Sequence, residues 1–257
     1  MNHPIVFRKS RSIPRTTPAP PADTIHVWAA RLDAELHNGP AESALLGTME
    51  LQRADRFRFE RDGARFVASH VFLRRILGAY LEIGPQAVEF SYGDQGKPVL
   101  ADGCGFPRLQ FSLAHSQEIT VIAIGWESLG IDVEKVRRIE DYESLARRHF
   151  SRREQEALRM LPAELRDRAF YACWTRREAV LKAEGIGLAA LDNLRDAEFD
   201  LDSGVQLVRV RDQRAAATVW MVADLVPCAE AVGAVAMPAT IETVAATLVG
   251  DSDAPIR

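Results

Sequence analysis

The chain has 257 residues, of which 47% are hydrophobic and 26% are charged, as expected for a globular protein with one large or two small cores. The formal net charge of -4 gives no overall attraction to nucleic acid or to a membrane surface, and no apolar run approaches the roughly 18 residues that cross a bilayer. Cys104, Cys173 and Cys228 form no CxxC pair, which excludes a disulfide framework or a zinc motif and favours a reducing, cytoplasmic setting.

Both ends of the chain are predicted to be tails. Residues 1–23 are basic and proline-rich and lack the apolar stretch of a secretory signal, so we expect a flexible tail, with an organelle transit peptide as the alternative. Residues 241–257 are predicted to form a C-terminal tail. The folded part of the chain is therefore expected between residues 24 and 240.

The first half, residues 24–128, is predicted to run strand, helix, helix and then three strands. The predicted elements are a strand over 25–30, helices over 41–60 and 63–81, and strands over 88–92, 109–113 and 119–126. Asp62 is the expected N-cap of the second helix, which Gly84-Pro85 ends. Each strand is short, as in an antiparallel sheet covered by helices.

The second half, residues 129–240, repeats this order of elements. The predicted elements are a strand over 129–133, a short helix opened by a capping box from Ser151 to Glu154, a long helix from Pro162 to Glu184 ended by Gly185, and strands over 197–201, 206–210, 218–225 and 229–236. The elements lack a regular βαβ alternation, which favours an α+β fold with antiparallel sheets. The repeated order suggests an internal duplication with a boundary near Ser128.

Two acidic segments of the second half predict a site for a metal ion and a phosphate. Asp132 and Glu134 lie two residues apart in a predicted strand, so both side chains point to the same face. Glu178 and Lys182 lie four residues apart and share one face of the long helix. Three carboxylates beside one ammonium suit a hard divalent cation, which binds carboxylate oxygens together with substrate phosphates. The pattern indicates chemistry on a phosphate ester or anhydride.

Each acidic pair has an ordinary structural alternative when it is taken alone. Asp132 and Glu134 are also typical of an edge strand with its polar face in water, and Glu178 with Lys182 is typical of a surface salt bridge. The helix segment 170–181 is apolar on nearly all sides, which predicts a central position. Because a central helix seldom carries a charge without a partner, the functional interpretation is favoured.

Basic residues and one histidine precede the acidic segments and are candidates for binding an anion. They are Arg53, Arg56, Arg58, Arg61, Arg65, Lys97 and His115. The alternatives are a solvated helix face for the arginines, an ordinary loop for Lys97 in the turn Gly96-Lys97-Pro98, and a structural histidine for His115. The order and spacing of the whole set favour one common site.

In this order the residues resemble the Sfp-type 4′-phosphopantetheinyl transferases, over roughly residues 28–236. The family has an (I/V)G(I/V)DxE segment, an (F/W)xxKExxxK segment, a GKP turn, an FNxSHS segment and an EGxGL segment. Their counterparts are Leu129–Glu134, Trp174–Lys182, Gly96-Lys97-Pro98, Phe111–Ser116 and Glu184–Leu188. The chain departs from the family at Arg177, where the family has lysine, and at Ala114, where the family often has serine.

The resemblance implies a pseudo-twofold monomer of two similar α+β halves, each a small antiparallel sheet packed with helices, with coenzyme A in the cleft between them. By the same resemblance Asp132, Glu134 and Glu178 would hold Mg²⁺ against the pyrophosphate, and Lys182 would contact the same phosphates. The adenosine end of coenzyme A would be held by Arg53, Lys97, Pro98 and His115, with Arg65 as a weaker candidate.

The implied activity is Mg²⁺-dependent transfer of 4′-phosphopantetheine from coenzyme A to a serine of an apo acyl or peptidyl carrier protein, with release of adenosine 3′,5′-bisphosphate. Glu178, directly or through a water, is the expected proton acceptor and Lys182 the expected phosphate stabiliser. The two-half form usually serves secondary metabolism. Two alternatives stay open: another Mg²⁺-dependent phosphotransferase or nucleotide hydrolase, although no GxxxxGK[ST] loop is present, and a non-catalytic coenzyme A-binding protein.

Overall fold

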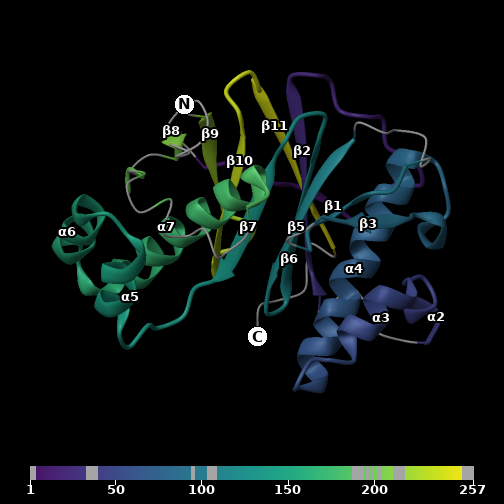
Figure 1. The fold of residues 1–257 in the computed structure, drawn as a ribbon, viewed down its shortest axis with the longest axis horizontal. Helices are drawn as coiled ribbons and strands as arrows, with labels where there is room; N and C mark the ends of the chain where they lie inside the picture. The colour runs from purple at the N-terminus through teal and green to yellow at the C-terminus, as the bar shows by residue number, and fades with distance from the viewer. Residues whose placement is uncertain are drawn as a thin grey trace.

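The structure is a computed structural model that describes residues 4–32, 40–93, 96–102, 109–186, 194, 197, 199–201, 204–210 and 218–250. Cys104 and the last two residues of the EGxGL counterpart lie outside the described residues. Two sheets stand side by side at the centre, and helices cover them on the two outer sides (Figure 1). In the described part of the chain, no helix combines the length and the apolar character that crossing a membrane requires.

The first sheet has five strands in the order β1-β11-β2-β6-β5. The strands are β1 (Arg8–Ser10), β2 (Thr24–Arg31), β5 (Gln110–Ser116), β6 (Ile119–Gly125) and β11 (Thr243–Val249). Helix α4 (Glu60–Leu81) lies along one face, where its Phe72 and Ile76 pack with Ile122 and Ile124 of β6. The smaller elements of this half are α2 (Pro40–Ser43), α3 (Thr48–Ala54), η1 (Pro85–Ala87) and the paired strands β3 (Phe90–Tyr92) and β4 (Pro98–Leu100).

The second sheet has four antiparallel strands in the order β7-β10-β9-β8. The strands are β7 (Gly130–Lys135), β8 (Val205–Val210), β9 (Thr218–Leu225) and β10 (Ala231–Pro238), and the helices are α5 (Tyr142–His149), α6 (Arg152–Met160) and α7 (Ala163–Glu184). Helix α7 crosses this sheet, while α5 and α6 lie beyond it (Figure 1). Gly185 ends α7 in the left-handed conformation (φ 72°), as its sequence position predicts.

The two halves share a core and meet along β5 and β7. Val27 of β2, Val121 of β6, Ile131 of β7 and Val235 of β10 belong to one buried cluster. The Ser112 side chain of β5 accepts a hydrogen bond from the backbone N–H of Ile131 on β7 (3.2 Å). The strand that carries the acidic pair is therefore held directly against the first half.

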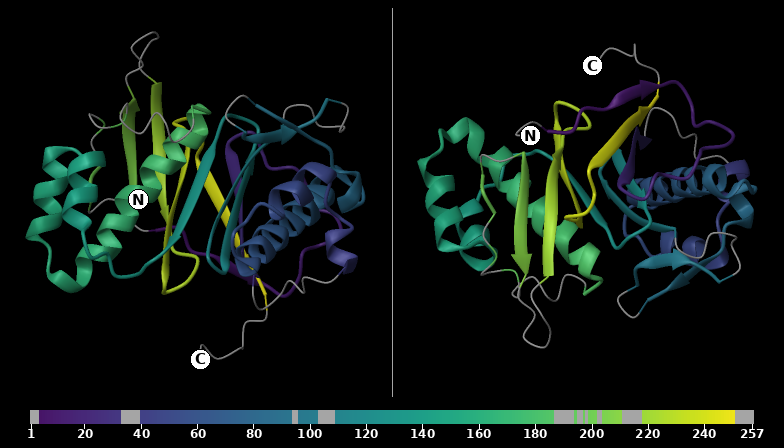
Figure 2. Two further views of the ribbon diagram at one scale, coloured as in Figure 1. Left: turned by 60° about the horizontal axis from the view of Figure 1, so that its bottom comes forward. Right: turned by 90° about the horizontal axis from the view of Figure 1, so that it is seen from above.

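The predicted α+β class is confirmed, and the two predicted tails need correction. Strand β11 lies in the supposed C-terminal tail and pairs in parallel with β2, while β1 lies in the supposed N-terminal tail and pairs in parallel with β11. The first sheet is therefore mixed rather than antiparallel. Upstream of β1, the backbone N–H of Ile5 donates to the Asp224 carbonyl on β9 (3.0 Å), so the N-terminal segment contacts both halves (Figure 2). These strands cover an edge of β2 that would otherwise be unpaired.

Three further sequence predictions are also wrong in detail. The predicted helix over 41–60 is broken into α2 and α3, because Glu50 turns back to accept a hydrogen bond from the Gly47 backbone N–H (2.8 Å) and starts a new helix there. Helix α4 begins at Glu60 after Phe59, not at the predicted cap Asp62. The described residues of 197–201 form no strand, and α5 was not predicted.

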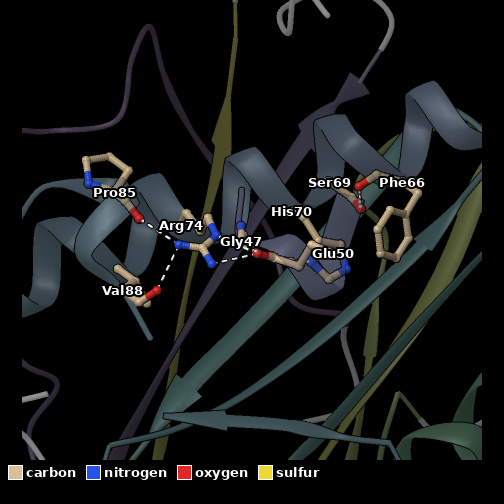
Figure 3. Close-up of polar contacts among 8 residues, drawn as sticks. All are labelled: Gly47, Glu50, Phe66, Ser69, His70, Arg74, Pro85 and Val88. Atoms are coloured by element: carbon tan, nitrogen blue, oxygen red, sulfur yellow. Dashed lines mark hydrogen bonds and ion pairs between the residues drawn. The ribbon is translucent and has the colours of Figure 1, made fainter. Parts of the chain in front are cut away.

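Each half contains the same buried ion pair, which supports the suggested duplication. Arg74 and Arg177 are both the fifteenth residue of a 22-residue helix. The Arg74 guanidinium contacts Glu50 at 2.6 Å (Figure 3), and the Arg177 guanidinium contacts Glu154 at 2.5 Å. Both glutamates also accept a hydrogen bond, at 2.8 Å, from the backbone N–H three residues earlier. The same device therefore anchors each long helix to a short preceding helix.

Candidate active site

A cavity of about 770 Å³ is lined by residues from both halves. The first half contributes Arg53, Phe57, Phe66, His70, Gly96, Lys97, Pro98 and residues 111–115, and the second contributes Asp132, Val133, Glu134, Trp174, Glu178, Leu181, Lys182 and Gly185. Every site residue that the family resemblance implies, except Arg65, is among these described lining residues, whereas the further candidate arginines Arg56, Arg58 and Arg61 are not. The carboxylates lie on β7 and α7, with Trp174 and Lys182 also on α7, whereas Arg53, Phe66, His70 and His115 come from α3, α4 and β5. The cavity thus has an acidic side and a cationic side.

Gly130 brings β7 unusually close to α7 and so builds the acidic side. A Cβ atom at this position would lie 2.0 Å from the Ala179 carbonyl oxygen and 2.4 Å from the Ala183 nitrogen, both on the backbone of α7. Only glycine permits this approach. Asp132 of β7 is consequently carried to the side chain of Lys182 on α7.

Lys182 and Ser116 each hold one carboxylate of β7. The Lys182 ammonium lies 2.8 Å from Asp132 Oδ1 and donates a second hydrogen bond to the Ile131 carbonyl (3.1 Å). The Ser116 hydroxyl, from β5 in the other half, donates to Glu134 Oε2 at 2.6 Å. Both carboxylates are therefore oriented before any ligand is bound.

Two buried carboxylate oxygens of the acidic side have no hydrogen-bond partner among the described residues: Asp132 Oδ2 and Glu178 Oε1. Burial, followed by the nearby Asp132 charge, raises the pKa of Glu178 to about 7, although Lys182 opposes the shift. Burial likewise raises the pKa values of Asp132 and Glu134, against the opposing effects of Lys182 and Ser116 respectively. Unpaired buried anions are costly, so the arrangement calls for a cation.

The carboxylates fit a magnesium ion that shares its coordination with a substrate. No group of three or more His, Cys, Asp or Glu side chains in the described part of the chain forms a complete metal site. Mg²⁺ does not need one, because it typically takes one or two carboxylates together with waters and substrate phosphates. Asp132 Oδ2 and Glu178 Oε1 are the oxygens positioned to act in this way.

The cationic side is an assembly of Arg53, Phe66, His70 and His115. The Arg53 guanidinium lies over the Phe66 ring, 5.6 Å from its centroid, and the ring centroids of Phe66 and His70 are 4.1 Å apart. Burial, followed by the charges of His70, Lys182, Arg53 and Arg65, lowers the pKa of His115 to about 4. An anion that enters this side meets the Arg53 guanidinium, with the His70 and His115 rings beside it.

Lys97 and Arg65 differ from the expected roles. Lys97 lines the cavity, but its ammonium donates to the backbone carbonyls of Leu129 (3.1 Å) and Lys182 (2.7 Å) in the second half. Burial, followed by the charge of Lys182, lowers the pKa of Lys97. Arg65 does not line the cavity in the described part of the chain, and its guanidinium lies 3.7 Å from Glu118. Lys97 thus joins the two halves, and the charge of Arg65 acts on His115.

The two departures from the family pattern have different surroundings. Arg177 is completely buried, and its guanidinium is sandwiched between the rings of Phe150 and Phe199, at 4.7 and 4.6 Å from their centroids. It serves the ion pair with Glu154. Ala114, in contrast, lines the cavity. We therefore expect the departure at Arg177 to affect the stability of the fold and the departure at Ala114 to affect ligand binding.

Sequence reasoning overlooked Phe57, Phe66 and His70 as lining residues and Ser116 as the support of Glu134. Ser116 stands in the FNxSHS counterpart and was detectable from it. Phe66 and His70 looked like members of the apolar stripe of a helix, and no local pattern distinguishes a stripe that faces a cavity from one that faces a core.

Comparison with known proteins gives consistent matches along the chain. Residues 128–236 match the family model of the 4′-phosphopantetheinyl transferase superfamily, and residues 40–127 match the model of a 4′-phosphopantetheinyl transferase N-terminal domain. The chain is 38% identical over 226 residues to the 4′-phosphopantetheinyl transferase HetI of Nostoc sp., which covers 86% of this chain and 92% of the relative. It is 35% identical to a putative 4′-phosphopantetheinyl transferase of Synechocystis sp. (69% and 74% covered) and 28% identical to Sfp of Bacillus subtilis (54% and 59%).

Proposed function

This chain belongs to the 4′-phosphopantetheinyl transferase superfamily of enzymes, and we propose that it transfers 4′-phosphopantetheine from coenzyme A to a serine of an apo acyl or peptidyl carrier protein in a Mg²⁺-dependent reaction. The observation that carries the proposal is the polarity of the cavity. Unpaired oxygens of Asp132 and Glu178 lie on one side, and Arg53 and His115 lie on the other. A pyrophosphate with a metal ion suits the first side, and the adenosine end with its 3′-phosphate suits the second.

The reaction is a phosphoryl-type transfer whose bonds balance without a further reactant. The carrier serine Oγ forms a bond to the phosphorus that bears the pantetheine, and the anhydride bond from that phosphorus to the oxygen of adenosine 3′,5′-bisphosphate breaks. The serine proton passes to the Glu178 carboxylate, directly or through a water. Lys182, held by Asp132, stabilises the negative charge on the departing phosphate. Bound Mg²⁺ supplies charge neutralisation on the pyrophosphate oxygens.

The remaining site residues hold and orient the donor. Arg53 and His115 bind the adenosine end, and Lys97 and Pro98 form the wall beside them by holding the turn against the second half. Both halves of one chain line the cavity, so the proposed site needs no second subunit, and we propose a monomeric enzyme. Free Cys173 and Cys228 thiols among the described residues support a cytoplasmic setting.

The test is the intact mass of an apo carrier protein after incubation with the enzyme, coenzyme A and Mg²⁺. We expect the carrier to gain the mass of one phosphopantetheine, and we expect EDTA or Asp132→Ala to abolish the gain. Activity that survives Asp132→Ala would contradict the metal assignment. Coenzyme A that binds, with no gain on several unrelated carriers, would favour a binding protein instead.

A further inference from the structure

His70 is a polar residue on the cavity-facing side of α4 that the proposed reaction does not yet use. Its Nδ1 lies 2.9 Å from Glu50 Oε1 (Figure 3), and its ring lines the cavity. Because Glu50 holds Nδ1, the ring orientation is fixed and Nε2 is the nitrogen that a ligand in the cavity can meet.

The second half shows that the buried ion pair does not require this histidine. His70 and Cys173 are both the eleventh residue of their 22-residue helices, and each lies one turn before the paired arginine. The Arg177–Glu154 pair forms beside Cys173, and burial raises the pKa of the Cys173 thiol to about 12 and leaves it neutral. The histidine is therefore an addition that is specific to the half that faces the cationic side of the cavity.

The surroundings of His70 select an anion as its ligand. Arg53 and His115 line the same side, and Phe66 packs between Arg53 and His70. The one nearby anion, among the contacts recorded for His70, is Glu50, and Arg74 already neutralises it through contacts at 2.6 and 2.9 Å. Glu50 is thus already paired with Arg74, and the cavity-facing edge of the His70 ring is left for a ligand.

We propose that His70 binds the terminal phosphomonoester of the donor, with Glu50 as the positioning residue that aims Nε2 at the phosphate; this role rests on the proposed use of coenzyme A. In this arrangement the Glu50 carboxylate accepts a hydrogen bond from Nδ1–H and the bound phosphate accepts one from Nε2–H. Arg53 and His115 complete the subsite, and the Phe66 ring supports it. His70 thereby distinguishes donors that carry the 3′-phosphate from donors that lack it.

Two substitutions separate a ligand role from a structural one. His70→Asn places the side-chain amide near the position of Nδ1, so the contact with Glu50 survives while the reach into the cavity is lost. His70→Gln places the amide near the position of Nε2, so the reach survives while the contact with Glu50 is weakened. His26→Asn is the matched control, because His26 lies in the same half, contacts Tyr80 at 2.6 Å and does not line the described cavity.

The measurement is the Kd of coenzyme A and of 3′-dephospho-coenzyme A by calorimetry with Mg²⁺ and no carrier protein. We expect His70→Asn to raise the Kd of coenzyme A about tenfold, since the lost hydrogen bond is one to a charged group. The Kd of 3′-dephospho-coenzyme A should change by less than about twofold. His70→Gln should lose less affinity for coenzyme A, and His26→Asn should keep the affinity and the kcat of the wild type.

Three results would overturn the inference. The first is an equal rise in the Kd of both donors in His70→Asn, and the second is an unchanged Kd of coenzyme A in a folded His70→Asn. The third is a wild type that binds coenzyme A no more tightly than 3′-dephospho-coenzyme A. Each leaves the proposed transferase activity standing. A wild-type chain that binds neither donor would instead contradict the proposed function itself.

Discussion

The buried charges that anchor the long helices differ from those that line the acidic side of the cavity. Glu154 has both carboxylate oxygens bound by Arg177, at 2.8 and 2.5 Å, and Glu50 is bound by Arg74 and His70. Asp132 and Glu178, in contrast, each keep one buried oxygen without a partner among the described residues.

A buried carboxylate therefore stabilises the fold at the ion pairs and destabilises it at the acidic side of the cavity. The hydrogen bonds to Glu50 outweigh the effect of burial and hold its pKa at about 2, whereas burial raises the pKa of Glu178 to about 7. A carboxylate whose two oxygens are both hydrogen-bonded to protein groups has no free oxygen to coordinate a metal ion or to accept a proton. The unpaired carboxylates are the ones available for chemistry, and their substitution should have the opposite effect on the fold.

The largest expected effect is the loss of an anchor. Arg177→Met leaves Glu154 buried without its partner, and we expect a loss of about 3–5 kcal/mol in the free energy of unfolding, measured in urea. The double variant Glu154→Leu/Arg177→Met should recover much of this loss, because no unpaired charge remains. A stable Arg177→Met with little transferase activity would instead place Arg177 in the active site.

Glu178→Gln should have the opposite effect, with lower activity and higher stability. We expect kcat to fall at least about a hundredfold, because the proton acceptor and a metal ligand are removed. The free energy of unfolding at pH 8 should rise by about 1 kcal/mol, because a desolvated charge near Asp132 and Glu134 is gone. A loss of stability like that of Arg177→Met would mean that Glu178 is structural.

The pH dependence of stability tests the anchor in the first half. The folded-state pKa of Glu50, about 2, lies below its ordinary value of 4.5, so its stabilisation is fully present above about pH 4.5 and is lost as the pH falls towards 2. The shift corresponds to on the order of 3 kcal/mol. The difference in unfolding free energy between the wild type and Glu50→Gln should therefore be constant from pH 7 to 5 and shrink below pH 4.5. A difference that grows in acid would refute the assignment.

Lys97 tests whether a cation of the cavity is structural. Lys97→Met removes two hydrogen bonds to the Leu129 and Lys182 carbonyls, and we expect a loss of about 1–2 kcal/mol in the free energy of unfolding. The Kd of coenzyme A, measured by calorimetry, should change less than about threefold. A tenfold weaker Kd with unchanged stability would show that Lys97 leaves these carbonyls to bind the donor.

Ala114→Ser is expected to have the smallest effect. The substitution adds at the cavity wall the hydroxyl that the family often carries there, and we expect coenzyme A to bind up to about threefold more tightly, since one hydrogen bond to solvent is exchanged for one to the ligand. Calorimetry at constant Mg²⁺ measures the change. Weaker binding would indicate that this cavity wall has no room for the oxygen.

The acidic site was predictable from the sequence because its geometry is local. Asp132 and Glu134 share a strand face through the period of two, and Glu178 and Lys182 share a helix face through the spacing of four. The long helix ended where Gly185 predicted, and the strand over 218–225 has the predicted bounds. Each of these features depends on neighbours within a few residues.

Only the tertiary structure decided which side chains meet across the two halves. Gly130 stands in the (I/V)G(I/V)DxE counterpart, but only the structure shows why a glycine is needed there: its missing Cβ sets the distance between β7 and α7. The cavity-facing role of His70, the use of Lys97 as a link between the halves and the pairing of β11 with β2 join residues that are far apart in the chain. Local periodicity determines which face a side chain occupies, but the packing of the whole chain determines what that face meets.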